Sequence, residues 1–199
     1  MKENRIRKIV TGGVLSALLI VLGATGLGFI MLPMGAITVL QVPVIIAAIL
    51  EGPVVGIFTG LLFGVFSIVQ AAIIGVTPAD LAFLHYPLIA IVPRILIGPA
   101  AWLVYSLLSG RLFRAGEPGF ARETAATAAG AIVGSLVNTI LVLSAFALFL
   151  PGLVSRQLIV GLASLNGTVE AGFSAAIALA VILPWKGISR GKTSRLNAE

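Results

Sequence analysis

The chain has 199 residues, of which 59% are hydrophobic and only 10% are charged, and its mean hydropathy is +1.14. Soluble domains carry about 25% charged residues, so the composition predicts an integral membrane protein, folded as a single domain over residues 1–199. The absence of cysteine and the single histidine exclude disulfides, cysteine metal sites and histidine clusters. The net charge of +6 does not indicate nucleic acid binding, because the basic residues flank the hydrophobic segments.

Six apolar segments approach the length of about 20 residues that a membrane-spanning helix needs. The predicted fold is therefore all-α, a single bundle of six transmembrane helices, the second of them short. The predicted helices cover, in chain order, about 9–30, 37–50, 54–74, 87–108, 123–150 and 158–183, followed by a basic tail at 185–199. Glycine and proline mark loops at 31–36 and 75–86.

The positions of the basic residues predict the orientation of the bundle. If the chain crosses six times, eleven of its thirteen Lys and Arg residues lie on the side that holds both termini. The positive-inside rule places that side in the cytoplasm. We therefore expect a multi-pass protein of a cell membrane, in a prokaryotic plasma membrane, with both termini cytoplasmic.

Polar side chains inside the apolar segments are the candidates for function. Arg94 and Glu170 are opposite charges within helices, and a charge at the helix centre costs about 2.5–3.5 kcal/mol on insertion scales, so it is usually functional. Counted along the predicted helices, the polar residues gather between the outer surface and the midplane, which predicts a substrate pocket open to the outside. The candidate residues are Gln41, Gln70, Arg94, Asn138, Asn166 and Glu170.

The alternative for the two charges is an ion pair that only holds helix 87–108 to helix 158–183. Both roles can coexist, since arginine is suited to bidentate recognition of a carboxylate or phosphate. No catalytic set or metal-ligand cluster is recognisable, and Gly187–Thr193 has three residues between its glycines where a phosphate-binding loop needs four. We therefore expect no enzyme activity, no cofactor and no metal site.

Small residues at four-residue spacing predict close helix packing. They form ridges at Gly52, Gly56, Gly60 and Gly64, at Ala126, Gly130 and Gly134, and at Gly13 with Ala17. Several of these segments resemble the substrate-binding S components of energy-coupling factor (ECF) vitamin transporters. The resemblance rests on Ile37–Ile46, Glu51–Gly56, Gly60–Ser67, Val92–Gly98 and Val137–Thr139 and covers nearly the whole chain.

The resemblance implies a subunit that captures a vitamin from outside and joins a transmembrane T component and two cytoplasmic ATPases. It also implies that loops 31–36 and 75–86 close over the substrate, and that Gly13 and Ala17 meet the T component. The segments look most like the pantothenate type, for which Arg94 would suit the carboxylate. Gln70, Asn138 and Asn166 would suit its hydroxyls and amide. Hydroxymethylpyrimidine, folate or riboflavin remain alternative substrates, and a six-helix membrane scaffold without transport remains an alternative function.

Overall fold

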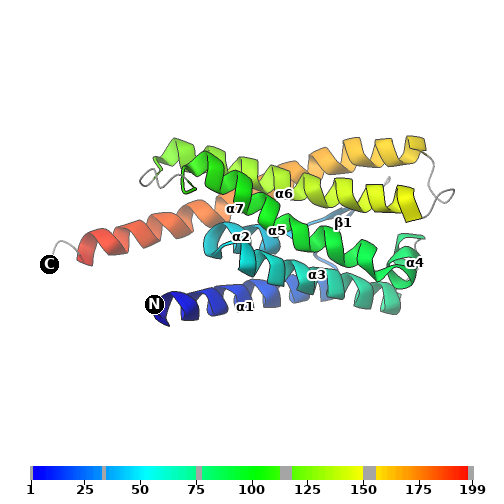
Figure 1. The fold of residues 1–199 in the computed structure, drawn as a ribbon, viewed down its shortest axis with the longest axis horizontal. Helices are drawn as coiled ribbons and strands as arrows, with labels where there is room; N and C mark the ends of the chain where they lie inside the picture. Colours follow the sequence, from blue (N-terminus) through cyan, green and yellow to red (C-terminus); the bar gives the residue numbers. More distant parts are fainter. Residues whose placement is uncertain (1, 33–34, 75–77, 113–117, 150–155, 197–199) are drawn as a thin grey trace.

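A computed structural model describes residues 2–32, 35–74, 78–112, 118–149 and 156–196, with side chains over 5–28, 38–73, 80–112, 118–149 and 167–187. Helices form most of it (Figure 1). The elements are α1 (Lys2–Ala24), β1 (Phe29–Leu32), β2 (Gly35–Thr38), α2 (Gln41–Glu51), α3 (Pro53–Ile74), α4 (Pro78–His85), α5 (Pro87–Ser109), α6 (Phe120–Phe149) and α7 (Arg156–Leu196).

Five helices are long and apolar enough to cross a membrane. The spanning segments are Arg5–Ala24, Pro53–Ile73, Pro87–Ser109, Phe120–Phe149 and Gly167–Gly187. The remaining predicted span, α2, is apolar but has only 11 residues, about 16 Å at 1.5 Å per residue. That is half of the roughly 30 Å hydrocarbon core of a bilayer.

Two connections that were predicted to be loops contain regular structure. β1 and β2 pair as an antiparallel hairpin, with Phe29 opposite Thr38 and Leu32 opposite Gly35, a short exception in a fold that is otherwise helical, as predicted. The helix predicted to run to residue 30 ends at Ala24, because Gly26 takes a left-handed backbone (φ 76°) that stops it. In the second connection α4 begins at Pro78, a residue favoured in the first turn of a helix.

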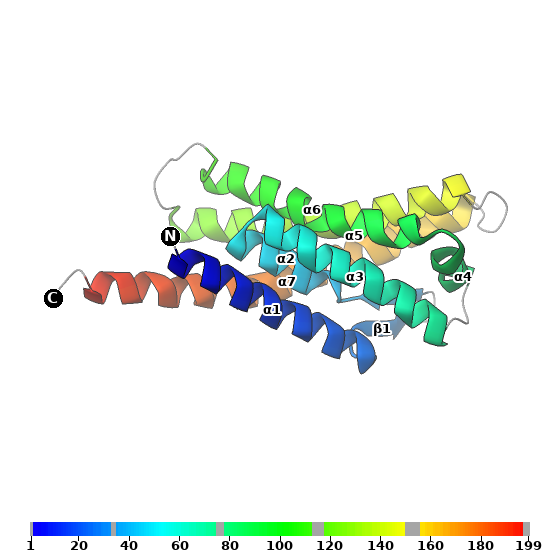
Figure 2. The same cartoon turned by 60° about the horizontal axis from the view of Figure 1, so that its bottom comes forward.

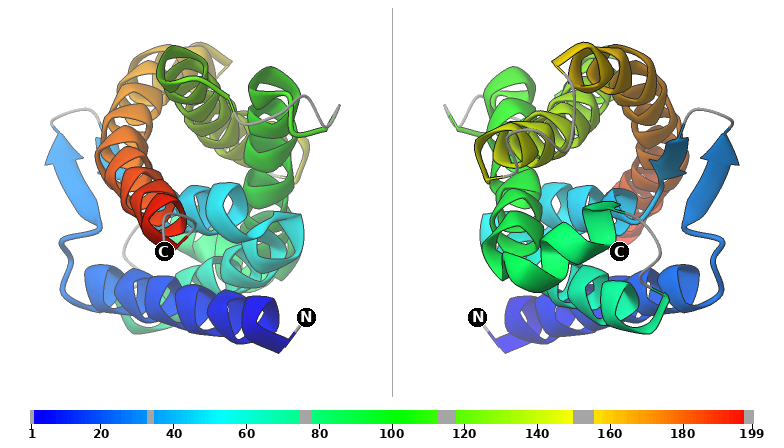
Figure 3. Two further views of the ribbon diagram at one scale, coloured as in Figure 1. Left: turned by 90° about the vertical axis from the view of Figure 1, so that its left-hand side faces the viewer. Right: turned by 90° about the vertical axis from the view of Figure 1, so that its right-hand side faces the viewer.

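The short helix α2 forms the centre of the bundle. It contacts α1, α3, α5, α6 and α7, and all its residues except Leu50 are buried. Seen along the long axis, it lies between α5 and α7, on the inner side of α1 (Figure 3). A helix that is apolar on every side belongs in such an interior. α1 packs against α2 and α3 from outside (Figure 2). α1 begins and α7 ends at the same end of the bundle (Figure 1).

The glycine ridge of α3 brings it into backbone contact with α5. A Cβ atom added to Gly60 would lie 2.2 Å from the carbonyl oxygen of Arg94, and one added to Gly98 would lie 2.7 Å from the Cα of Gly56. Gly64 meets Ile91 in the same way. The predicted packing ridge is therefore confirmed for these positions. It is wrong for Gly52, which has open space around it and a φ of 104° in the turn between α2 and α3.

A buried charge cluster includes Lys186, which belongs to the segment 185–199 predicted to be a basic tail. α7 continues to Leu196, and the Lys186 ammonium contacts both the Glu123 carboxylate and the Tyr105 hydroxyl. The Glu123 side chain is 4% exposed and the Lys186 side chain 12%. The sequence placed both charges at helix ends, but long side chains reach back along a helix.

The α3–α5 contact predicts the effect of adding one methyl group. Gly60→Ala should lower the free energy of unfolding by about 1–3 kcal/mol, because the backbone of α5 must move to make room. Gly172→Ala is the matched control, since its Cβ would meet nothing within 4 Å. Thermal unfolding of the detergent-purified protein measures both, and equal melting temperatures would contradict the close contact.

Candidate functional site

Gln41, the first residue of α2, is the centre of a buried hydrogen-bond network. Its Nε2 donates to the hydroxyl of Ser135 at 2.7 Å and to that of Ser174 at 3.2 Å. Its Oε1 accepts from Nδ2 of Asn138 at 3.1 Å. The Gln41 side chain is fully buried, where an unpaired amide would cost several kcal/mol. One amide thus connects α2 to both α6 and α7.

Glu170, one helical turn before Ser174 on α7, connects this network to the hairpin. One carboxylate oxygen accepts the backbone N–H of Thr38 on β2 at 2.7 Å. The other accepts the hydroxyl of Thr139 on α6 at 3.3 Å. The carboxylate is 7% exposed, and hydrogen bonds to an ionised acceptor are about twice as strong as neutral ones. Glu170 therefore holds the end of the hairpin against α6 and α7.

Arg94 lies apart from this network, enclosed by α3, α4 and α5. Its guanidinium lies 4.8 Å from the ring centre of Phe83 and 5.5 Å from that of Phe63, within the range of cation–π attraction. Its Nη1 donates to the carbonyl of Ile89 at 3.1 Å. Pro93, four residues after Ile89, has no N–H for that carbonyl. The proline therefore provides the acceptor that orients the arginine.

The ion pair considered from the sequence is not formed as a contact. Among the residues whose side chains are described, only Arg7–Glu51 and Lys186–Glu123 come within 4 Å of each other as ion pairs. Arg94 and Glu170 attract each other electrostatically without touching. Arg94 donates to the carbonyl of Ile89, and Glu170 accepts from the backbone N–H of Thr38. A direct bond between them does not hold α5 to α7.

Two buried polar atoms of the site have no hydrogen-bond partner in the described part of the chain: Nε of Arg94 and Oδ1 of Asn138. Both residues are 7% exposed. A buried donor or acceptor left unpaired costs about 1–3 kcal/mol, and such a group is available to a ligand that enters. One of these atoms donates and the other accepts.

The structure brings together only part of the predicted site. Gln41 and Asn138 are in direct contact, and Glu170 joins their network through the neighbouring Thr139. Gln70 on α3 is partly buried and has no contact with them among the bonds described. Asn166 lies in α7 but outside the residues whose side chains are described.

Sequence reasoning missed the small hydroxyl residues that complete the network. Ser135 and Ser174 bond the Gln41 amide, and Thr139 bonds Glu170. A helical spacing signal existed, since Ser135, Asn138 and Thr139 lie three and four residues apart on one face of a helix, as do Glu170 and Ser174. Serine and threonine are common at helix contacts in membranes, so the spacing alone did not distinguish these network residues from ordinary packing residues.

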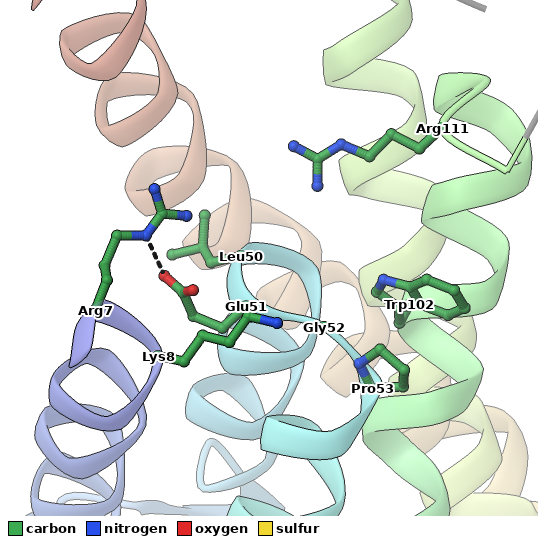
Figure 4. A pocket seen from close by; sticks show the side chains of 8 residues that line it. All are labelled: Arg7, Lys8, Leu50, Glu51, Gly52, Pro53, Trp102 and Arg111. Atoms are coloured by element: carbon green, nitrogen blue, oxygen red, sulfur yellow. Dashed lines mark hydrogen bonds and ion pairs between the residues drawn. The ribbon is translucent and has the colours of Figure 1, made fainter. Parts of the chain in front are cut away.

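A cavity of about 450 Å³ lies at the other end of α2, not at this network. Glu51, the last residue of α2, lines it together with Arg7, Lys8, Trp102 and Arg111 (Figure 4). Glu51 is about 15 Å along the helix from Gln41. The cavity is therefore separate from the Gln41 network. It lies at what we call the basic end of the bundle, where Arg7, Lys8 and Arg111 are found.

Comparison with known families shows which family the chain belongs to. The model of the family described as "ECF transporter, substrate-specific component" matches residues 7–185. The chain belongs to this family. It is thus a substrate-specific component of a transporter and not an enzyme, and it is a multi-pass membrane protein of the prokaryotic cell membrane. The resemblance seen in its motifs is confirmed.

A similar protein is the pantothenic acid transporter PanT of Lactococcus lactis subsp. cremoris (strain MG1363). The two are 34% identical over 125 residues, which are 56% of this chain and 57% of PanT. The match thus spans a little more than half of the length of that relative.

The role of Glu170 at the hairpin can be tested directly. In Glu170→Ala, amide hydrogen exchange over residues 29–40 should be faster, because the Thr38 N–H loses its carboxylate acceptor and local opening becomes easier. Mass spectrometry of peptides from that segment measures the change. Thr139→Val removes the other bond of the carboxylate and should alter exchange at the hairpin much less. Unchanged exchange in Glu170→Ala would show that Glu170 does not hold the hairpin.

Proposed function

We propose that this chain is the vitamin-capture subunit of an ECF transporter, and that its substrate is pantothenate taken from the outer side of the membrane. Two findings support the function: membership of the substrate-specific component family over residues 7–185 and the partial match to a pantothenic acid transporter. The structural observation that carries the substrate is the buried Arg94 guanidinium with a free Nε.

In this proposal Arg94 binds the carboxylate of pantothenate. Its Nη1 bond to Ile89 and the two phenylalanine rings hold the guanidinium in place and leave Nε free to donate. Arginine binds a carboxylate best through two parallel N–H donors. A preoriented guanidinium loses little side-chain entropy when the ligand arrives.

The network around Gln41 provides the polar contacts for the rest of the ligand. Oδ1 of Asn138 is a free acceptor and suits a hydroxyl or amide N–H of pantothenate. Gln41 holds the Asn138 amide in this orientation through its own bond to Nδ2. We assign Asn138 as a direct contact and Gln41 as a positioning residue, and we retain Gln70 and Asn166 as proposed contacts on α3 and α7.

We assign Glu170 a different role, because both of its oxygens already have donors. It holds the hairpin and balances the charge of Arg94 through space. The hairpin and α4 then serve as the two segments that close over the substrate. α4 suits this role because Phe83 covers the Arg94 guanidinium and stacks on Phe146 of α6, with ring centres 5.8 Å apart.

We also propose that α2 completes a six-span topology with both termini in the cytoplasm. Glu51 at the end of α2 bonds Arg7 near the start of α1, and Val39 just before α2 bonds Gly28 just after α1. α2 therefore runs antiparallel to α1 and returns the chain to its starting side. Its half length is compatible with a membrane because the surrounding helices, not lipid, cover it.

The proposed partners are a transmembrane T component and two cytoplasmic ATPases. Gly13 and Ala17 are exposed on the outer face of α1, and a Cβ atom at Gly13 would meet nothing within 4 Å. Small residues on an open helix face allow a partner helix to approach closely. We propose this face as the surface that meets the T component.

A structural scaffold was the alternative function, with Arg94 and Glu170 as its fastening ion pair. These two charges are not in contact among the described side chains, and the match to the substrate-specific component family supports transport in place of the scaffold. Another vitamin remains possible as the substrate, and its identity is an outcome of the binding experiment below.

Arg94→Gln should weaken pantothenate binding by about tenfold to a hundredfold, since a hydrogen bond to a charged group contributes about 1.5–3 kcal/mol. Calorimetric titration of the purified protein measures the dissociation constant. The alcohol analogue, in which the carboxylate is replaced by a primary alcohol, is the matched ligand control. The wild type should prefer pantothenate, and Arg94→Gln should lose that preference.

Two results would contradict the assignment in different ways. An unchanged preference for pantothenate in Arg94→Gln would show that Arg94 does not bind the carboxylate. If pantothenate fails to stabilise the wild type while another vitamin does, the substrate is wrong and the capture function stands. A ligand at a thousand times its dissociation constant stabilises by about 4 kcal/mol, so a panel of vitamins distinguishes these cases.

The docking face predicts a separation of binding from transport. Gly13→Leu with Ala17→Leu should reduce co-purification with the T component and vitamin uptake by cells, because the added side chains hold a partner helix away. Pantothenate binding by the isolated subunit should not change. Gly172→Leu is the control, since Gly172 also has open space beside it. Normal uptake by the double variant would place the docking surface elsewhere.

A further inference from the structure

The cavity beside Glu51, at the end of the bundle where α1 begins, is separate from the proposed vitamin site. It lies where α2 meets α3 and faces the start of α1 and the end of α5, with a volume of about 450 Å³. Arg7 and Lys8 reach it from one side, and the Arg111 guanidinium points into it from the other (Figure 4). Glu51 is the acidic residue among those that line it.

The charges in this cavity do not cancel. Arg7 donates to Glu51 at 3.1 Å, and the Glu51 side chain is only 1% exposed, so this pair is neutral and occupied. Lys8 and Arg111 remain without a carboxylate in contact among the described side chains. Arg111 is also attracted electrostatically to Glu123, but that carboxylate is already paired with Lys186. The cavity therefore carries an excess of about two positive charges, which attract an anion.

Two neighbouring features indicate which anion this is. Trp102 lines the cavity, and tryptophan in membrane proteins favours the level of the lipid headgroups. The exposed apolar residues Ile9 and Val54 directly follow the lining residues Lys8 and Pro53 and would contact lipid chains. In addition, α3 begins at Pro53, and the start of a helix carries partial positive charge.

We propose that this cavity binds the phosphate group of an anionic phospholipid, held between Lys8 and Arg111. Basic pockets between transmembrane helices at the cytoplasmic side are suited to such headgroups. The Arg7–Glu51 pair forms the wall of the site and fixes α1 against the turn between α2 and α3. The inference rests on the proposed topology, which places this end of the bundle at the cytoplasmic side, but it does not depend on the substrate assigned to the other site.

Native mass spectrometry of the whole subunit tests the proposal, with phosphatidylglycerol and phosphatidylcholine offered in turn. The wild type should retain phosphatidylglycerol preferentially. Each of Lys8→Gln and Arg111→Gln should weaken its retention roughly fivefold, and the double variant roughly thirtyfold. The reason is that each Lys or Arg near an anionic lipid surface contributes about 1 kcal/mol of binding free energy, which corresponds to about fivefold in affinity. Thermal unfolding confirms that the variants fold.

The matched control is Arg5→Gln, which removes one exposed charge from the same helix at a position that does not line the cavity. It should retain phosphatidylglycerol like the wild type. Equal losses in Arg5→Gln and Lys8→Gln, or equal retention of the two lipids by the wild type, would overturn the proposal. Inorganic phosphate offered without lipid tests whether the bound anion is a lipid headgroup or a free phosphate. If phosphate binds in a manner that depends on Lys8 and Arg111, and the protein shows no preference for phosphatidylglycerol, the anion is not a lipid.

Discussion

The position of the candidate site depends on the backbone contact between α3 and α5. Gly60 lies against the carbonyl of Arg94, and Gly56 against Gly98, so the two helices meet without side chains between them. Such contacts drive helix association in membranes, where the surrounding lipid is as apolar as leucine. The same contact places Phe63 of α3 beside the Arg94 guanidinium. One packing interface therefore stabilises the bundle and fixes the arginine.

The buried polar groups divide into two kinds according to whether their bonds are complete. Lys186, Glu123 and Tyr105 satisfy one another at the end of the bundle where the termini lie, and breaking such a buried pair would leave an uncompensated charge. This cluster is structural. Arg94 and Asn138 each retain an unpartnered atom. Ser16 and Thr127 also have unpartnered hydroxyl oxygens, but Arg94 and Asn138 are the two such residues that belong to the candidate site.

The two ends of α2 then have different chemistry within one short helix. At its start, Gln41 gathers side chains from α6 and α7. At its end, Glu51 meets Arg7 beside a cavity with excess positive charge. All residues of α2 except Leu50 are buried, so the neighbouring helices hold both ends of this helix in place.

The sequence by itself determined the class of the protein. Its composition and long apolar runs indicate that the fold lies in a membrane, and its motifs indicate the family to which it belongs. It also indicated Arg94, Glu170, Gln41 and Asn138 as candidate site residues, because polar side chains inside apolar helices stand out one residue at a time. Only the tertiary structure decided how they pair: Glu170 bonds the hairpin, Arg94 bonds a carbonyl freed by Pro93, and Lys186 returns to Glu123. These partners lie on different helices or depend on side-chain direction, and helical periodicity in one dimension contains no information on which faces meet.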